Sequence, residues 1–379
     1  MKHIVIIGGG FAGLMALKQL VKGKNLKLTL INKNNYFLFT PRLTELLNES
    51  VNRNIVIKDI KKIFGNKINF IDSKAKFIDF NKNYIEIEKN NIKINYDYLI
   101  IAQGATTNYF GNKNIENNTI DYKNYDSVLK IKNKIKNNVQ KYSKTNKKEL
   151  LTFTVIGAGL TGIELICSLR ETILKELNKY PNISPKDTRF VLIQREKTIA
   201  PQLPDKVRSN IEKYLKNKNI EIMTGTRVEN IKNGTIISKD KKIRASTIIW
   251  TAGIMANTIK TNPKLKLDKG NTIKVTSRMK IPRYDNVYVT GDAALFIENN
   301  KPLPATAQTA WQQGVNIGKN ILRRINGKKE TDFHYNHKGT LIVLGSKYGI
   351  FTYKNITLSG TSAWYFRDLA YKLRFKQIT

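Results

Sequence analysis

The sequence contains little of the chemistry that cysteine and histidine provide. Cys167 is the only cysteine among 379 residues, which excludes an intrachain disulfide, a C-x-x-C redox pair and a cysteine metal cluster. It lies inside a helical pattern, which favours a small core residue. The three histidines, His3, His334 and His337, form no metal-ligand pattern with acidic neighbours, so no metal site is expected.

Long apolar runs are also missing. No stretch reaches the roughly 18 apolar residues that a membrane-spanning helix needs. The apolar N-terminus runs directly into glycines and does not resemble a signal peptide. We therefore expect a cytoplasmic protein, or one attached peripherally to the cytoplasmic face of a membrane.

Acidic residues are few. The chain has 29 of them against 66 lysines and arginines, a formal net charge of +37. Such a charge can favour nucleic acid or an anionic membrane surface. The lysines are spread along the whole chain without a basic and aromatic recognition motif, so no specific nucleic-acid partner is expected.

The apolar run Lys2 to Ile7 is followed without a gap by a G-x-G-x-x-G motif and then by a helical pattern. In this order of strand, turn and helix the motif indicates a dinucleotide site. Gly8 permits the tight turn, Gly10 lets the backbone approach a pyrophosphate, and Gly13 allows close packing of helix and strand. The N–H groups at the start of the helix face the same pyrophosphate.

The same order occurs a second time. The strand Leu151 to Ile156 is followed by Gly157-Ala158-Gly159-Leu160-Thr161-Gly162 and by a helix. Two such units in one chain predict two dinucleotides. The predicted fold class is α/β, with two Rossmann-like dinucleotide-binding domains and a small C-terminal region that carries an amphipathic helix.

Asn32 and Gln194 occupy the strand ends where a dinucleotide fold usually has an acid that binds a ribose hydroxyl. An asparagine amide can bind a hydroxyl without the help of charge. Gln194 beside Arg195 can tolerate a 2′-phosphate, so NADPH is expected to be accepted as well as NADH. Small residues at two further strand ends, Ala102 to Gly104 and Ala252-Gly253, are predicted to lie against the cofactors.

Eight segments together resemble the type II, non-proton-pumping NADH:quinone oxidoreductases, a branch of the two-dinucleotide-binding-domain flavoproteins. These segments are IVIIGGGFAG, NNYFLFTP, TNYFG, VIGAGLTGIEL, WTAGI, VYVTGDAA, PATAQTAWQQG and LSGTSAWYFR. They follow the family's order and cover most of the chain. The two glycine loops are general to the superfamily, whereas TNYFG, WTAGI and the glutamine-rich run are more specific.

The resemblance implies two sets of cofactor-binding residues. FAD is expected on Gly8, Gly10, Phe11, Ala12, Gly13, Asn32, Ala102, Gly104, Gly291, Asp292, Ala307 and Gln308. NADH or NADPH is expected on Gly157, Gly159, Leu160, Thr161, Gly162, Glu164, Gln194, Arg195, Ala252 and Gly253.

The resemblance also implies three catalytic residues. Glu164 is expected to border the nicotinamide; the alternative is a surface or capping carboxylate. Gln308 and Gln312 match the family's quinone motif, and their i, i+4 spacing places both amides on one helix face. The alternative role for the two glutamines is to satisfy backbone groups near the flavin.

The implied activity is an NAD(P)H:quinone oxidoreductase, in which a hydride passes from NAD(P)H to the flavin and two electrons pass to a quinone. Three alternatives remain open at this point. Two are related flavoprotein reductases, one acting on sulfide and quinone and one on a disulfide or carrier protein. The third is a redox-sensing nucleotide-binding protein attached to membrane or nucleic acid.

The expected domains are a discontinuous FAD domain (1–118 and 272–326), a connector helix (119–149), an inserted NAD(P) domain (150–271) and a C-terminal region (327–379). In that last region, Ala363, Phe366, Ala370 and Leu373 are predicted to share one face, with Arg367 among the basic residues around it. Such a helix suits a membrane interface. The alternative is that it packs on the core or on a second subunit in a homodimer.

Overall fold

A computed structural model describes all 379 residues, and its first part is built on a five-stranded parallel sheet. Continuous apolar runs form these strands because both faces of a parallel sheet are covered. In spatial order the strands are β22 (Val287–Val289), β9 (Tyr98–Ile101), β1 (Lys2–Ile7), β2 (Leu26–Asn32) and β5 (Asn69–Asp72).

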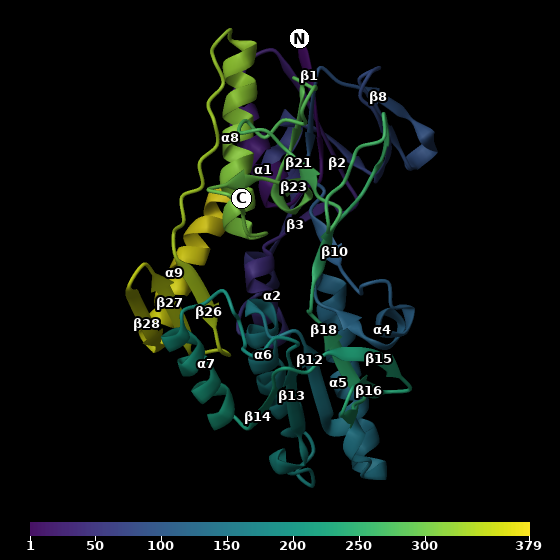
Figure 1. Cartoon of the computed structure of the whole chain (residues 1–379), viewed down its shortest axis with the longest axis vertical. Coiled ribbons are helices and arrows are strands. Elements are labelled where there is room, and N and C mark those ends of the chain that lie inside the picture. Colours follow the sequence, from purple (N-terminus) through teal and green to yellow (C-terminus); the bar gives the residue numbers. More distant parts are fainter.

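The middle of the chain repeats this arrangement in a second five-stranded parallel sheet, below the first one in Figure 1. Its strands in spatial order are β11 (Ile120–Asp121), β18 (Thr247–Trp250), β12 (Thr152–Ile156), β13 (Arg189–Ile193) and β14 (Ile220–Met223). In both sheets the strand that precedes a glycine motif is central, with the next strand of its own unit on one side. The predicted α/β fold with two Rossmann-like units is thereby confirmed.

Helices α1 (Phe11–Leu20) and α8 (Ala307–Ile325) lie side by side against the first sheet (Figure 1). Gly314 is a contact point between them, because a Cβ there would overlap the backbone of Ala12. The second sheet is covered by α5 (Tyr125–Thr145), α6 (Leu160–Leu177) and α7 (Asp205–Asn217).

Segment 119–149, expected as a connector, belongs structurally to the second sheet. Strand β11 pairs with β18, and α5 buries one apolar side, which consists of Val128, Ile131, Ile135 and Val139. The Asn138 amide donates to Thr247 Oγ1 at 2.9 Å and accepts from Ser246 Oγ at 3.1 Å, which ties α5 to β18. The division of the chain into domains stays a prediction, and we propose that α5 is counted with the second unit.

Two short strands connect the units. Strand β10 (Ala105–Thr107) continues from β9, strand β19 (Ile254–Ala256) continues from β18, and the two pair antiparallel. Beside them, Asn257 Nδ2 donates to the Gln103 carbonyl at 2.7 Å. The ribbon therefore joins the carboxyl ends of two strands, one from each parallel sheet.

The remaining elements are small. The first unit adds β3 (Tyr36–Leu38), α2 (Leu43–Leu47), β4 (Ile57–Asp59), α3 (Ile60–Phe64), β6 (Ala75–Asp79), β7 (Tyr84–Ile87), β8 (Lys93–Asn95), β20 (Lys260–Asn262), β21 (Ile273–Lys274), β23 (Ala294–Leu295), β24 (Ile297–Glu298) and β25 (Lys301–Pro302). Beside the second sheet lie α4 (Lys113–Asn118), β15 (Val228–Lys232), β16 (Thr235–Ser238) and β17 (Lys242–Arg244).

The C-terminal region is a sheet of three antiparallel strands followed by a helix: β26 (Thr340–Val343), β27 (Gly349–Tyr353), β28 (Ile356–Gly360) and α9 (Thr361–Ile378). Helix α9 runs from this sheet back toward α1 and α8, as the yellow ribbon in Figure 1 shows. None of the helices of the structure combines the length and the apolar character that crossing a membrane requires.

Two residues that the sequence placed on or around the membrane-facing side of α9 do not lie on the surface. Ala363 and Arg367 are fully buried, because α9 packs with this side against the rest of the protein and Arg367 reaches the carboxylate of Glu45. The apolar residues that α9 does expose are Tyr365, Phe366, Leu369 and Leu373.

Candidate active site

The first glycine loop has the geometry that its sequence predicts. Gly8 has φ of 105°, and a Cβ there would overlap the carbonyl of Ala102. A Cβ on Gly13 would overlap the carbonyl of Gly8, so helix α1 can approach its strand only through glycine. Gly10 faces open space, with nothing within 4 Å of where its Cβ would stand. The loop leaves room for a ligand beside Gly10 and the first turn of α1.

Two strand ends, those of β2 and β9, lie against this loop. Asn32 is the last residue of β2, and its Oδ1 accepts a hydrogen bond from Gly9 N at 2.9 Å while its Nδ2 donates to the Asn34 carbonyl at 2.7 Å. Ala102 lies against Gly8, and Gly104 faces open space. Asn32 therefore holds the loop itself, a structural role that its position in the sequence did not indicate.

Asp292 lies at the end of β22, close to the start of α8. Burial raises the pKa of its carboxyl, which the ammonium of Lys123 partly opposes. No hydrogen-bond partner contacts this carboxyl in the structure, whereas buried polar groups normally have one. Asp292 is thus available to bind a polar group of a ligand.

Gln313 is a site residue that the sequence did not single out. Its Oε1 accepts from Gly291 N at 2.8 Å and from Thr290 Oγ1 at 3.3 Å, and its side chain is buried. It therefore fixes the turn that presents Asp292. The neighbouring glutamines of the same run were predicted as functional, but only Gln313 points to this turn.

Helix α8 begins at Ala307, a few residues after Pro302, which pairs in β25. Its N-cap is Thr306, whose Oγ1 accepts from Thr309 N at 3.2 Å. The N–H groups at this end remain close to Asp292, where they favour negative charge.

The second glycine loop repeats the first. Gly157 has φ of 105°, and its Cβ would lie 2.7 Å from the backbone of Ala252. Gly162 contacts the Gly157 carbonyl, and Gly159 faces open space, as Gly10 does. Thr251 Oγ1 donates to the carbonyl of Gly157 at 2.9 Å and so holds the loop against the end of β18.

Gln194 stands at the end of β13 and contacts this loop directly. Its Oε1 accepts from Ala158 N at 2.8 Å, and its Nε2 donates to Glu196 Oε2 at 2.5 Å. Arg195 forms an ion pair with Glu196 Oε1, also at 2.5 Å. A carboxylate therefore lies next to the end of β13. It belongs to Glu196, two residues after Gln194, where the fold usually has its acid.

Glu164 in α6 is neither a capping nor a surface carboxylate. Its Oε1 accepts from Val343 N at 2.9 Å and so links α6 to the C-terminal sheet. Burial raises the pKa of Glu164 to about 7, against the opposing effect of the Arg367 guanidinium. The carboxyl of Glu45 nearby raises this pKa further.

Arg367 and Arg42 are the largest fully buried side chains of the protein. Arg367 forms an ion pair with Glu45 Oε1 and lies over the ring of Tyr371 at 4.1 Å. Arg42 reaches Glu45 Oε2 at 3.3 Å and Asp368 Oδ1 at 2.6 Å. These charges bind α2 to α9, and sequence spacing cannot reveal them because more than 300 residues separate the partners.

Gln308 and Gln312 hold one segment of backbone. Gln308 Oε1 accepts from Lys338 N at 2.6 Å, and its Nε2 donates to the Gly339 carbonyl at 3.3 Å. Gln312 exchanges two hydrogen bonds with the backbone of Asn336, at 2.9 and 3.0 Å. Both glutamines therefore satisfy backbone groups, which is the alternative role expected from the sequence. The backbone they bind lies in the segment that leads to β26.

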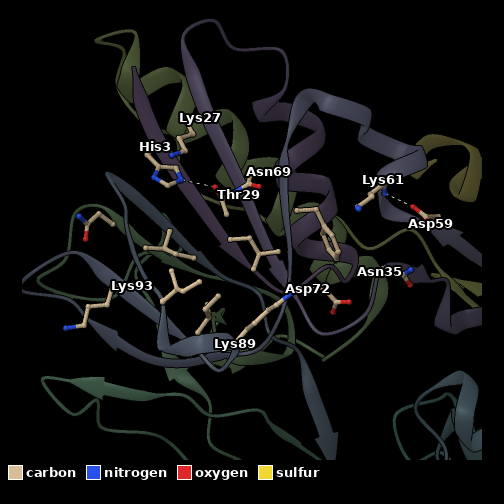
Figure 2. A pocket seen from close by; sticks show the side chains of 16 residues that line it. His3, Lys27, Thr29, Asn35, Asp59, Lys61, Asn69, Asp72, Lys89 and Lys93 are labelled. Carbon is tan, nitrogen blue, oxygen red and sulfur yellow. Dashed lines mark hydrogen bonds between the residues drawn. The ribbon is translucent and has the colours of Figure 1, made fainter.

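A cavity of about 950 Å³ lies away from both glycine loops (Figure 2). It opens between the first sheet and the strands β7 and β8, and it contains none of the predicted site residues. His3 lies at one end, with its Nε2 2.8 Å from Thr29 Oγ1. The four lysines and two aspartates of its lining match the overall charge bias of the chain. The lining residues of this cavity do not indicate a particular ligand.

The structure brings the predicted residues together as two groups. Around the first loop lie Gly8, Gly10, Phe11, Ala12, Gly13, Asn32, Ala102, Gly104, Gly291 and Asp292, with Ala307 and Gln308 at the start of α8. Around the second lie Gly157, Gly159, Leu160, Thr161, Gly162, Gln194, Arg195, Ala252 and Gly253, with Glu164 in the first turns of α6.

Two glycine loops at the carboxyl ends of two parallel sheets define an oxidoreductase of the class that binds two dinucleotides. The chain belongs to the pyridine nucleotide-disulphide oxidoreductase family, whose sequence model matches residues 2–314. The predicted similarity to type II NADH:quinone oxidoreductases within this class is confirmed. Proteins of that name from Staphylococcus saprophyticus and Staphylococcus aureus are each 25% identical over 361 residues, which cover 92% of this chain and 89% of theirs.

Solved structures support the fold. NDH2 from Plasmodium falciparum in complex with NADH has a TM-score of 0.87 at 20% identity, covering 100% of this chain and 97% of that one. The sulfide:quinone oxidoreductase from Aquifex aeolicus has a TM-score of 0.82 at 20% identity, covering 100% and 91%. The prediction of an oxidoreductase enzyme is confirmed by the family and the curated relatives together.

The pKa of Glu164 makes stability depend on pH. Because it is raised from 4.5 to about 7, the folded protein keeps a proton that the unfolded chain releases between these values. As pH rises through this window, the wild type should lose stability relative to Glu164→Gln, by up to about 3 kcal/mol. Gln keeps the acceptor for Val343 N, so urea unfolding of both proteins from pH 4 to 8 isolates the ionisation. A difference that stays constant with pH would contradict the prediction.

Proposed function

We propose that this protein is an FAD-dependent enzyme that passes electrons from NADH to a quinone. The observation that carries the proposal is the pair of glycine loops, each with an open face at Gly10 or Gly159 and each fastened to a neighbouring strand end. Two nucleotides bound in this way are what hydride transfer between a nicotinamide and a flavin requires. Relatives named type II NADH:quinone oxidoreductase support quinone as the acceptor.

The residues of the first unit fit FAD. The open face of Gly10 and the N–H groups of α1 suit its pyrophosphate, and the unpaired carboxyl of Asp292 suits a ribityl hydroxyl. The start of α8 favours negative charge at the ring system. When bound, the flavin supplies the redox chemistry, as acceptor of a hydride and donor of two electrons.

The other residues of the site have binding and positioning roles. The second loop binds the pyrophosphate of NADH, and Ala252-Gly253 receives its nicotinamide end. Glu164, with a pKa of about 7, can hold or release a proton at its carboxyl near neutral pH. Gln308 and Gln312 position the backbone of residues 336–339 beside the start of α8, and we place the quinone next to this segment.

The purified protein provides the first test. The flavin released on denaturation should be FAD, and NADH oxidation should accelerate several-fold when a soluble quinone is added. If the flavin is FAD but NADH oxidation is accelerated by a carrier protein and not by quinone, the alternative of a carrier-protein reductase would be favoured. Cys167 is buried and single, so a dithiol mechanism has no support in this chain.

The choice between NADH and NADPH depends on Glu196. The sequence favoured tolerance of NADPH because Gln194 stands beside Arg195, but Arg195 is paired with Glu196 and is largely exposed. The Glu196 carboxylate, hydrogen-bonded to Gln194, lies where a 2′-phosphate is expected and repels it. We therefore propose a preference for NADH.

Removing this charge should raise the use of NADPH. Glu196→Gln is expected to increase kcat/KM for NADPH about tenfold relative to that for NADH, which corresponds to roughly 1.4 kcal/mol. The control is Glu221→Gln, which removes another carboxylate that pairs with an arginine on the same sheet. An unchanged NADPH-to-NADH ratio in Glu196→Gln would exclude Glu196 as the selective residue.

We further propose that α9 attaches the protein to an anionic membrane surface. The helix exposes Tyr365, Phe366, Leu369 and Leu373 by 49 to 64%, and the strand before it exposes Leu358. Lys372, Arg374 and Lys376 are exposed on the same helix. Apolar side chains flanked by cations suit the interface of an anionic bilayer. A second subunit is the competing occupant of this face.

Point substitutions test this surface better than removal of the helix, because truncation would also remove Arg367 and Asp368, the α9 partners of the buried Glu45 and Arg42. Phe366→Gln, Leu369→Gln and Leu373→Gln combined should lower sedimentation with anionic vesicles at least about tenfold. Leu129→Gln, at an exposed apolar position of α5, serves as control. Unchanged vesicle binding, together with loss of a dimer in solution, would assign the face to a second subunit.

A further inference from the structure

Phe110 is an exposed aromatic residue in an unfavourable backbone conformation. Its side chain is 62% exposed, and its φ is 53°, in the left-handed region that bulky residues rarely adopt. Strain of this kind persists where the surrounding structure imposes it, and it concentrates at ligand sites. Neither the exposure nor the strain contributes to folding, so the ring requires another explanation.

The surrounding turn is firmly built. Phe110 N donates to Asn108 Oδ1 at 2.8 Å, and Asn108 N donates to the Gly253 carbonyl at 3.0 Å. Trp250 Nε1 donates to the Asn108 carbonyl at 2.9 Å. Two of these hydrogen bonds fix Asn108 to the carboxyl end of β18, and the third closes the turn in which Phe110 has its left-handed conformation.

The ring lies on Gly253. A Cβ at residue 253 would stand 3.0 Å from Phe110 Cζ, tighter than normal packing allows. On another side the ring meets Trp250 edge to face, with centroids 6.5 Å apart. Because Gly253 has no side chain, the ring of Phe110 can pack against the end of β18. The rest of the ring is exposed to solvent.

A continuous line of contacts leads from the adenosine end of the second nucleotide site to Phe110. Gln194 contacts the glycine loop at Ala158, Gly157 of that loop touches Ala252, and Gly253 touches Phe110. The ribose of the adenosine belongs at Gln194 and the pyrophosphate at the loop. The nicotinamide half must then extend past Ala252 toward Gly253.

We propose that the ring of Phe110 forms a wall of the nicotinamide pocket and contacts the nicotinamide riboside of bound NADH. This rests on the proposed function, in which the second glycine loop binds NADH. An aromatic face against a flat heterocycle stabilises the complex. The ring also displaces water from the atoms between which the hydride moves.

Ligand binding to the FAD-loaded protein, with its flavin reduced beforehand and air excluded, tests the contact without hydride transfer. Phe110→Gly removes the ring and accommodates the left-handed backbone, so the variant should fold at least as well as the wild type. We expect NADH to bind about five- to tenfold more weakly. ADP-ribose, which lacks the nicotinamide, should keep its affinity, and Phe110→Tyr should restore the binding of NADH.

Each outcome has a distinct meaning. Equal weakening of NADH and ADP-ribose would assign Phe110 a structural role and overturn the proposal. Unchanged NADH binding in Phe110→Gly would overturn it as well, while leaving the proposed function intact. A wild type that binds neither ligand would overturn the proposed function and this contact together. Gly253→Ala provides a second approach, because the added Cβ displaces the ring of Phe110. It should weaken the binding of NADH more than that of ADP-ribose.

Discussion

The structure depends on one constraint, the close approach of a glycine loop to the next strand end of its sheet. The backbone of Gly8 packs against Ala102, and that of Gly157 packs against Ala252. In both places the two backbones are too close to leave space for a Cβ on the glycine. Helices α1 and α6 can begin directly above these loops only because Gly13 and Gly162 are equally small. The two proposed nucleotide sites, and the orientation of the helix N-termini toward them, follow from this contact.

A second constraint joins the two ends of the chain. Glu45 in α2 lies between Arg42 and the buried Arg367 of α9, while Glu164 lies near Arg367 and accepts from Val343. Buried charges of this kind are costly unless each is paired. The pairing requires α9 to dock with Arg367 inward, and this docking leaves the apolar residues on the opposite side of the helix exposed. The same cluster raises the pKa of Glu164 into the neutral range.

How far the sequence predicted the site depended on how local each interaction was. The turn at Gly8 and the close packing at Gly13 depend on backbone geometry set within six residues, so both were predicted correctly from spacing. Arg367 was predicted on the surface, because a helical repeat shows which residues share a face and not which face is covered. Glu196 and Gln313 were missed, since each acts by contacting a strand end that the linear motif does not include.

The sequence by itself determined the two Rossmann-like units, the strand ends beside each glycine loop and the family, because apolar runs, glycine spacing and short motifs are local properties. Only the tertiary structure decided that Gln308 and Gln312 hold the backbone of residues 336–339 and that the ring of Phe110 lies on Gly253. The physical reason is that these contacts join residues far apart in the chain. Their partners are selected by packing and by the need to pair buried polar groups, and neither leaves a pattern in the linear sequence.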